Sequence, residues 1–291
     1  MNEKHLKTNL FLLYFLLTLL SASIFPCTGS AETYRFVRMW PVMTQPWYFF
    51  MPFDVAVNGD AYVYVADTNN HRIRKFSSDG HFISEWGSPG YRDSDFNFPH
   101  GICVDPVSGN VCVADTKNRR IKIFDSNGRW LRAWGEFGSG EGMFDDPYAI
   151  TADNSGFIYV ADTNNHRIQK FTDTGRFISA WGEYGSSTGQ FDKPRGIHAA
   201  DGFIYVADTG NHRIQKFKAD GTFLTAWGNS ADDPVQLEMP VGISTDNAGT
   251  VYVSDHKDDD PPEIINRIIS YTDEGTFISQ WGAQRQRRRR T

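Results

Sequence analysis

The sequence predicts an all-β protein, a β-propeller built from four-stranded antiparallel blades, and two observations carry this prediction. One nine-residue run recurs through the 291 residues, four times nearly intact and once in degraded form. Each period also contains four short runs of β-branched and aromatic residues separated by turn residues, which is typical of an antiparallel meander. A single sheet of this kind cannot bury both faces, so the copies must stack, and units of this length stack radially.

The recurring run is Val-Ala-Asp-Thr-Asn-Asn-His-Arg-Ile at residues 65–73. It returns with small changes at 113–121, 160–168 and 206–214, and a broken copy begins at Val253. Its aspartates stand 48, 47, 46 and 47 residues apart, at Asp67, Asp115, Asp162, Asp208 and Asp255. A regular period of this size indicates a repeat architecture.

The second copy shows the strand pattern most clearly. Its four expected strands are Gly101–Asp105, Val111–Ala114, Arg120–Phe124 and Trp130–Trp134. The turn before each fourth strand contains a glycine, which supplies the positive φ that a tight hairpin needs. These glycines are Gly80, Gly128, Gly175, Gly221 and Gly275. A tryptophan ends each fourth strand, and we expect these side chains to pack between blades: Trp86, Trp134, Trp181, Trp227 and Trp281.

These motifs resemble the NHL repeat over residues 34–282. The resemblance lies in the recurring run, in the segment Asp-Gly-x-Phe-x-x-x-Trp-Gly that follows it, and in the later Gly-x-Phe-x-x-Pro-x-Gly-Ile. It implies a six-bladed ring closed by strands from both chain ends. Here Phe36–Trp40 matches only an outer strand, so we expect five complete blades plus an orphan N-terminal outer strand, an incomplete version of the six-bladed form. We interpret the arginine run after Gly282 as a truncated C-terminus.

Three segments make up the predicted organisation: a signal peptide at 1–31, the propeller at 32–282 and a disordered basic tail at 283–291. Lys4 and Lys7 precede an apolar run at 10–20, and small residues end at Ala31, which is the pattern of a secretion signal. We therefore expect a secreted or periplasmic protein. A membrane-anchored protein is the alternative, because the apolar run and its extension approach the length that spans a bilayer.

The charge balance bears on the partners. Cleavage after residue 31 would leave 27 basic and 34 acidic residues, a net charge of −7. Five of these basic residues are arginines in the tail, so the propeller itself carries about −12. We expect no nucleic acid partner, since nucleic acid binding needs basic surface, and membrane contact only through an uncleaved N-terminal segment.

The mature chain keeps Cys103 and Cys112, which are too few for a disulfide scaffold. If residues 105–110 form a hairpin connection, the two cysteines stand opposite each other on adjacent strands. Opposed Cβ atoms lie roughly 4.5–5.5 Å apart, slightly wide of the disulfide range. A bridge and two buried thiols both remain open.

Each copy carries an aspartate and an arginine that bracket one tight loop, and we expect a charge-assisted hydrogen bond to close it. The pairs are Asp67 with Arg72, Asp115 with Arg120, Asp162 with Arg167, and Asp208 with Arg213. Metal binding by His71, His166 and His212 is disfavoured because equivalent residues of different blades lie far apart. The acidic insertion at 255–267 lacks calcium-loop spacing and is expected to be a solvated loop. We predict no metal and no cofactor.

Positions that differ between copies are the better candidates for a binding site. A proline leads into each first strand, and the residue after it differs in every copy: Phe53, His100, Tyr148, Arg195 and Val241. We expect these five side chains to ring one mouth of the central channel. Aromatic and cationic groups together suit an anionic or mixed small molecule or a peptide end. A channel lined only by packing side chains and water is the alternative.

The sequence thus favours a non-catalytic exported propeller whose loop-rich face and channel mouth bind a protein, peptide or glycan partner. The alternative is a small-molecule enzyme at the channel mouth, resembling the peptidyl-hydroxyglycine lyases. Those propellers hold zinc with histidines placed after such prolines, and Pro99-His100-Gly101 matches this pattern. The other four copies do not match, and catalytic zinc needs about three protein ligands. We therefore assign no catalytic residue.

Overall fold

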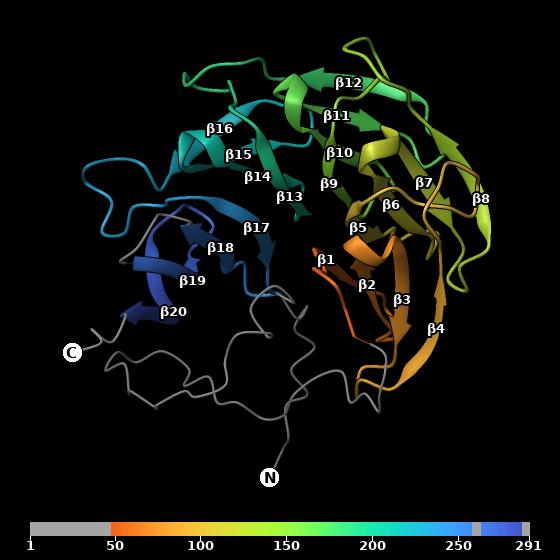
Figure 1. Ribbon diagram of the computed structural model, residues 1–291. Coiled ribbons are helices and arrows are strands. Elements are labelled where there is room, and N and C mark those ends of the chain that lie inside the picture. The colour runs from red at the N-terminus through yellow and green to blue at the C-terminus, as the bar shows by residue number, and fades with distance from the viewer. Residues whose placement is uncertain (1–47, 258–262, 287–291) are drawn as a thin grey trace.

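The computed structural model describes residues 48–257 and 263–286, which form five four-stranded antiparallel sheets. Each sheet runs in chain order from its first strand to its fourth, as a meander does. Figure 1 shows the sheets as blades arranged around a common axis, with the first strand of each blade innermost. The predicted propeller of four-stranded blades is confirmed. The expected signal peptide and the orphan strand at Phe36–Trp40 lie outside the described residues.

The blades are defined by their strands. Blade 1 contains β1 (Asp54–Val57), β2 (Val63–Asp67), β3 (Arg72–Phe76) and β4 (Phe82–Trp86). Blade 2 contains β5 (Pro99–Val104), β6 (Val111–Asp115), β7 (Arg120–Phe124) and β8 (Trp130–Trp134). Blade 3 contains β9 (Pro147–Ala152), β10 (Ile158–Asp162), β11 (Arg167–Phe171) and β12 (Phe177–Trp181). Blade 4 contains β13 (Pro194–Ala200), β14 (Phe203–Asp208), β15 (Arg213–Lys218) and β16 (Phe223–Trp227). Blade 5 contains β17 (Pro240–Thr245), β18 (Val251–Lys257), β19 (Glu263–Tyr271) and β20 (Phe277–Gln286).

The strands of blade 2 agree closely with the sequence prediction, except that β5 begins two residues early. Pro99 already pairs with Asp115, and a register irregularity separates this pair from Ile102 and Val113. Cys103 pairs with Cys112 as expected, and both are buried free thiols. At the other end of the chain, β20 continues to Gln286, so residues 283–286 of the expected tail lie in a strand.

A short 3-10 turn joins the second and third strands of the first four blades. These turns are η1 (Thr68–Asn70), η2 (Thr116–Asn118), η3 (Thr163–Asn165) and η4 (Thr209–Asn211). The next residue is left-handed, as at His71 with φ of 55°. The His71 Nδ1 atom accepts the backbone N–H of Phe98 at 3.1 Å, and His166 accepts that of Lys193 at the same distance. These histidines therefore have a structural role in the loops.

The threonine of the repeat joins each blade to the next. The Thr68 hydroxyl donates to the carbonyl of Pro99, at the start of β5, over 2.7 Å. The same bond recurs from Thr116 to Pro147, from Thr163 to Pro194 and from Thr209 to Pro240. In the fifth copy, His256 stands at this position. Sequence positions that repeat in blades 1–4 are thus explained by contacts between blades.

The rim tryptophans also pack between blades. A Cβ atom on Gly128 would lie 2.6 Å from the Trp86 ring, and the φ of Gly128 is +84°. Only glycine suits both its conformation and this contact. The arrangement recurs between Trp134 and Gly175, Trp181 and Gly221, and Trp227 and Gly275. The expected packing role is confirmed for these four tryptophans.

The inner strands β1, β5, β9, β13 and β17 follow one another around the axis, each in contact with the next. Within residues 48–257 and 263–286, β17 and β1 make no comparable contact. The described blades therefore form an arc that they do not close themselves. No helix in this part of the chain is long and apolar enough to cross a bilayer.

Candidate functional site

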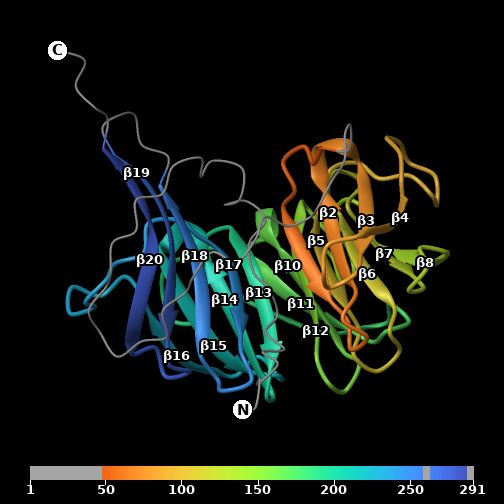
Figure 2. The same cartoon turned by 90° about the horizontal axis from the view of Figure 1, so that it is seen from below.

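The propeller has two chemically different ends, because connections within a blade alternate between them. Figure 2 shows the strands running from one end to the other. One end carries the 3-10 turns and the long connections between blades, and we call it the loop face. The other end carries the hairpins between first and second strands and between third and fourth strands, and we call it the hairpin face.

On the loop face, each Asp–Arg pair of the repeat joins two connections. The Arg167 Nε atom lies 2.8 Å from Asp162 Oδ2, and the second Asp162 oxygen accepts the backbone N–H of Asp145 from the incoming loop. The equivalent pairs are Asp67–Arg72, Asp115–Arg120 and Asp208–Arg213, at 2.8, 2.9 and 2.8 Å. In the fifth copy, Arg267 pairs with Asp255 in the same way at 2.8 Å. These pairs hold the loop face together.

At the channel mouth on this face, four of the five candidate residues come together. The rings of Phe53 and His100 are 4.8 Å apart, Phe53 and Tyr148 are 4.7 Å apart, and His100 stacks on Tyr148 at 4.4 Å. The Arg195 guanidinium lies 5.4 Å from the centre of the Tyr148 ring. Val241 follows Pro240 at the start of β17 and is partly buried. Side chains from blades 1 to 4 therefore form one cluster.

Two members of this cluster have unusual polar environments. Burial lowers the pKa of His100 to about 4, so its imidazole is neutral at pH 7, and Nδ1 donates to the Phe98 carbonyl at 3.0 Å. The Arg195 Nε atom is buried without a hydrogen-bond acceptor. An arginine that is charged at all ordinary pH values and incompletely paired can bind a carboxylate or phosphate.

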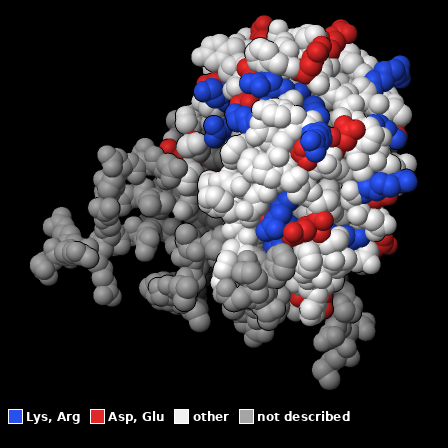
Figure 3. All heavy atoms as spheres, turned by 45° about the vertical axis from the view of Figure 1, so that its right-hand side comes forward, with Lys and Arg blue, Asp and Glu red and all other residues white. Residues whose placement is uncertain are grey.

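The loop face also carries exposed aromatic side chains. Tyr91, Phe137 and Tyr184 expose 76%, 66% and 69% of their surface, and Phe98 is also exposed. We call these four residues the aromatic arc. They lie on the connections from β4 to β5, β8 to β9 and β12 to β13, which all belong to the loop face. Figure 3 shows that basic and acidic side chains are interspersed over the visible surface, with uncharged areas between them.

Three residues of the arc contact the left-handed residue of a neighbouring 3-10 turn. His71 meets Phe98 edge-on with 4.5 Å between ring centres, and His166 meets Tyr184 at 4.8 Å. The Arg119 guanidinium lies 4.8 Å from the centre of the Phe137 ring. These contacts hold the aromatic rings in fixed positions and leave much of each ring accessible.

A cavity lies deeper in the channel, towards the hairpin face. Its volume is about 250 Å³, and none of the five candidate residues lines it. Its polar lining comes from Asp54, Thr151, Asn154, His198 and Ser244, with Cys103 beside them. Sequence reasoning missed these residues. Four of them, Cys103, Thr151, His198 and Ser244, stand four residues after the proline of their first strand, and this position also differs between copies.

Asp54 and His198 are two ionisable side chains of the cavity whose pKa values burial shifts strongly. Burial raises the pKa of Asp54 to about 6, although the N–H groups of Ile102 and Val55 donate to its carboxylate. Burial lowers the pKa of His198 to about 4, and its Nε2 atom lies 3.2 Å from the Thr245 hydroxyl. At pH 7 the cavity therefore contains an anionic carboxylate and a neutral imidazole.

Within the described ranges, 48–257 and 263–286, no three His, Cys, Asp or Glu residues gather into a group that could hold a metal ion. Part of the acidic insertion, residues 258–262, lies outside these ranges.

Comparison with known protein families matches the NHL repeat at residues 51–76, 96–124, 144–171 and 191–217. With its four-stranded blades, the chain belongs to the NHL-repeat β-propeller family. Protein brain tumor from Drosophila melanogaster is 34% identical over 96 residues, which span 32% of this chain and 9% of that protein. The chain thus matches less than a tenth of the length of this relative.

Solved structures share the fold at low sequence identity. One is the nidogen–laminin complex, with a TM-score of 0.61, 16% identity and coverage of 80% of both chains. A protein of unknown function from Bacteroides caccae has a TM-score of 0.60 and 14% identity, covering 79% of this chain and 80% of its own. Virginiamycin B lyase from Staphylococcus aureus, in an inactive form with quinupristin, has a TM-score of 0.58 and 17% identity, covering 78% and 68%. These likenesses concern the fold alone.

Proposed function

We propose that the propeller is a non-catalytic binding module whose loop face and channel mouth bind a segment of a protein or peptide partner. The observation that carries the proposal is the aromatic arc, which places exposed rings on three successive connections between blades. Aromatic side chains are enriched where proteins bind one another.

The geometry favours an extended segment over a compact ligand. The arc follows the loop face from blade 1 to blade 3, and the cluster with Arg195 lies at the axis. A segment crossing from the arc to the mouth would bury apolar side chains against the rings. An acidic side chain or a terminal carboxylate would then reach the Arg195 guanidinium. We therefore expect a partner segment with apolar residues and one acidic group.

The test begins with a random peptide library panned against the exported chain, followed by calorimetry on the selected peptides. Arg195→Ala should weaken binding by more than about 1 kcal/mol, as expected for loss of a charged hydrogen bond, and leave the melting temperature nearly unchanged. Tyr184→Ala should weaken binding similarly, because tyrosines that become buried when a partner binds often supply much of the binding energy. Val107→Ala is the matched control, since Val107 exposes 66% of its surface on the hairpin face.

Three outcomes would overturn this assignment. Peptides that bind all three variants equally would show that the loop face is not the site. A glycan that binds this face when no peptide does would replace the proposed partner class. Stoichiometric zinc in the purified protein would support the alternative, a small-molecule enzyme at the channel mouth near His100, because that reaction class holds its zinc with histidines.

We also propose that residues 1–31 direct export and that Phe36–Trp40 supplies an outer strand of an incomplete sixth blade. The sequence pattern of these segments supports both statements. Sequencing the N-terminus of the exported protein tests the first: a start near Glu32 supports cleavage, and an intact Met1 in the membrane fraction supports an anchor. Protection of the Met39 amide from hydrogen exchange tests the second, and rapid exchange there would contradict it.

A further inference from the structure

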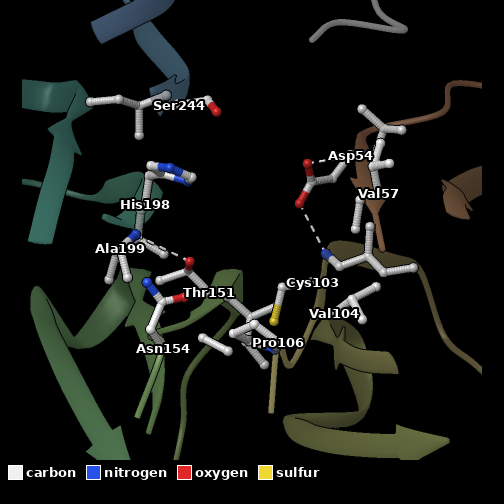
Figure 4. Close-up of a pocket in the computed structure, with 17 residues that line it drawn as sticks. Asp54, Val57, Cys103, Val104, Pro106, Thr151, Asn154, His198, Ala199 and Ser244 are labelled. Atoms are coloured by element: carbon white, nitrogen blue, oxygen red, sulfur yellow. Dashed lines mark hydrogen bonds between the residues drawn. The ribbon is translucent and has the colours of Figure 1, made fainter. Parts of the chain in front are cut away.

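The cavity towards the hairpin face has one charged wall. Figure 4 shows the Asp54 carboxylate on β1 and the His198 ring on β13 on opposite sides of an open space, with Thr151 and Asn154 between them. Apolar residues form most of the remaining lining, among them Val57, Val104, Pro106, Ala152 and Ala199. The cavity therefore combines a carboxylate with apolar walls.

The Asp54 carboxylate has only neutral donors around it. Oδ1 accepts the N–H of Val55 at 2.8 Å, and Oδ2 accepts the N–H of Ile102 at 2.9 Å. A carboxylate offers about four lone-pair sites, so both oxygens can accept further bonds from the cavity. In the part of the chain that the structure describes, no basic side chain lies within ion-pair distance of Asp54.

The charge is not needed to hold the inner strands together. In the other four copies, the position of Asp54 is occupied by Gly101, Ala149, Gly196 and Gly242. A Cβ atom on Gly196 would lie 2.1 Å from the Val241 carbonyl oxygen, so blades 4 and 5 approach with no side chain at that position. Between blades 3 and 4, the neutral Thr151 hydroxyl accepts the N–H of Ala199 at 3.2 Å. Asp54 accepts a hydrogen bond from the next blade, but a neutral acceptor does the same between blades 3 and 4, so this contact does not require its charge.

We propose that this cavity is a binding site for a small organic cation, an ammonium group on a compact apolar body, with Asp54 as its counter-ion. Asp54 is partly buried, and a carboxylate with reduced contact to water is costly unless it is paired. An ammonium group supplies both charge and hydrogen-bond donors. The volume of about 250 Å³ corresponds to about eight water-sized groups. The site lies at the other end of the channel from the proposed peptide site and does not depend on it.

The protonation states agree with this charge pattern. The three ionisable side chains that line the cavity are Asp54, His198 and Cys103. With a pKa of about 6, Asp54 is mostly ionised at pH 7, whereas His198, with a pKa of about 4, is neutral. The neighbouring Cys112 and burial raise the pKa of Cys103, so its thiol is neutral as well. The lining therefore carries one negative charge.

Benzylamine is a suitable probe, with benzyl alcohol as its neutral counterpart. Calorimetry on the full exported chain at pH 7 should show binding of benzylamine and at least tenfold weaker binding of benzyl alcohol. Asp54→Asn should weaken benzylamine binding at least tenfold. Asp93→Asn, which removes an exposed charge on the loop face, should leave it unchanged. Circular dichroism shows whether each variant is folded.

A pH series on the wild-type chain keeps the proposal testable if Asp54→Asn does not fold. Protonation of Asp54 should weaken benzylamine binding about tenfold between pH 7 and pH 5, as follows from a pKa of about 6. Equal affinity at both pH values would overturn the proposal, and so would equal affinity for the alcohol. Calcium binding that requires Asp54, in the absence of benzylamine binding, would identify a metal site instead.

Discussion

Replacing Arg167 with alanine should strongly destabilise the loop face. The variant loses the 2.8 Å ion pair with Asp162 and hydrogen bonds to the carbonyls of Ser139, Gly140 and Met143 at 2.7, 2.7 and 3.0 Å. The Asp162 carboxylate has no exposed surface, and burial already raises its pKa. Removing one partner of a buried ion pair costs about 3–5 kcal/mol.

We expect about 4 kcal/mol of lost unfolding free energy, since 15% of the Arg167 side chain is exposed and water replaces part of its contacts. For a domain of this size, the melting temperature should fall by about 10 °C. Urea denaturation and calorimetry at pH 7 measure both quantities. Arg176→Ala, which removes an exposed arginine of the same blade, is the control and should change stability by less than about 0.5 kcal/mol. A loss below about 1 kcal/mol in Arg167→Ala would refute the structural role of the pair.

Three further changes test other contacts. Burial raises the pKa of Asp54 to about 6, so its contribution to stability is present below pH 4 and is lost, by about 3 kcal/mol, as the pH rises through about 6. In urea titrations the unfolding free energy of Asp54→Asn should lack this fall with pH, and a pH profile identical to that of the wild type would contradict the prediction. A thiol reagent should label Cys103 and Cys112 much more slowly in the folded protein than after denaturation, because both are buried and because the neighbouring Cys112, together with burial, raises the pKa of Cys103. Equal labelling rates in the two states would contradict this, and absence of thiols after denaturation would show a disulfide. Thr116→Val should lower the free energy of unfolding by about 1–3 kcal/mol, because the Pro147 carbonyl loses the hydrogen bond from the Thr116 hydroxyl. A stability equal to wild type would show that this bond between blades is dispensable.

The repeat made the blades predictable because each repeated residue has a local task that recurs. The aspartate of the run binds the arginine five residues later, and the threonine after it reaches the next blade, as Asp115 and Thr116 do. Similarly, the tryptophan of one blade packs against the turn glycine of the next, so both residues recur in the repeat. Such short-range and copy-to-copy contacts can be inferred from one chain without an alignment.

The cavity could not be inferred in this way, because it depends on which residues of each first strand face the channel. A register irregularity follows the proline, as between Pro99 and Ile102. The residue after the proline therefore joins the cluster at the mouth, and the fourth residue, such as Cys103 or His198, lines the cavity. Asp54 did carry a visible signal, since it alone brings a charge to a position that holds glycine or alanine in the other copies.

The most direct test of the central claim, that the loop face is the binding surface, is a crystal structure of the protein with a selected peptide. We predict that the peptide contacts Phe137 and Tyr184 and places a carboxylate against the Arg195 guanidinium. A peptide bound instead to the outer strands at the rim, or at the hairpin face, would contradict it.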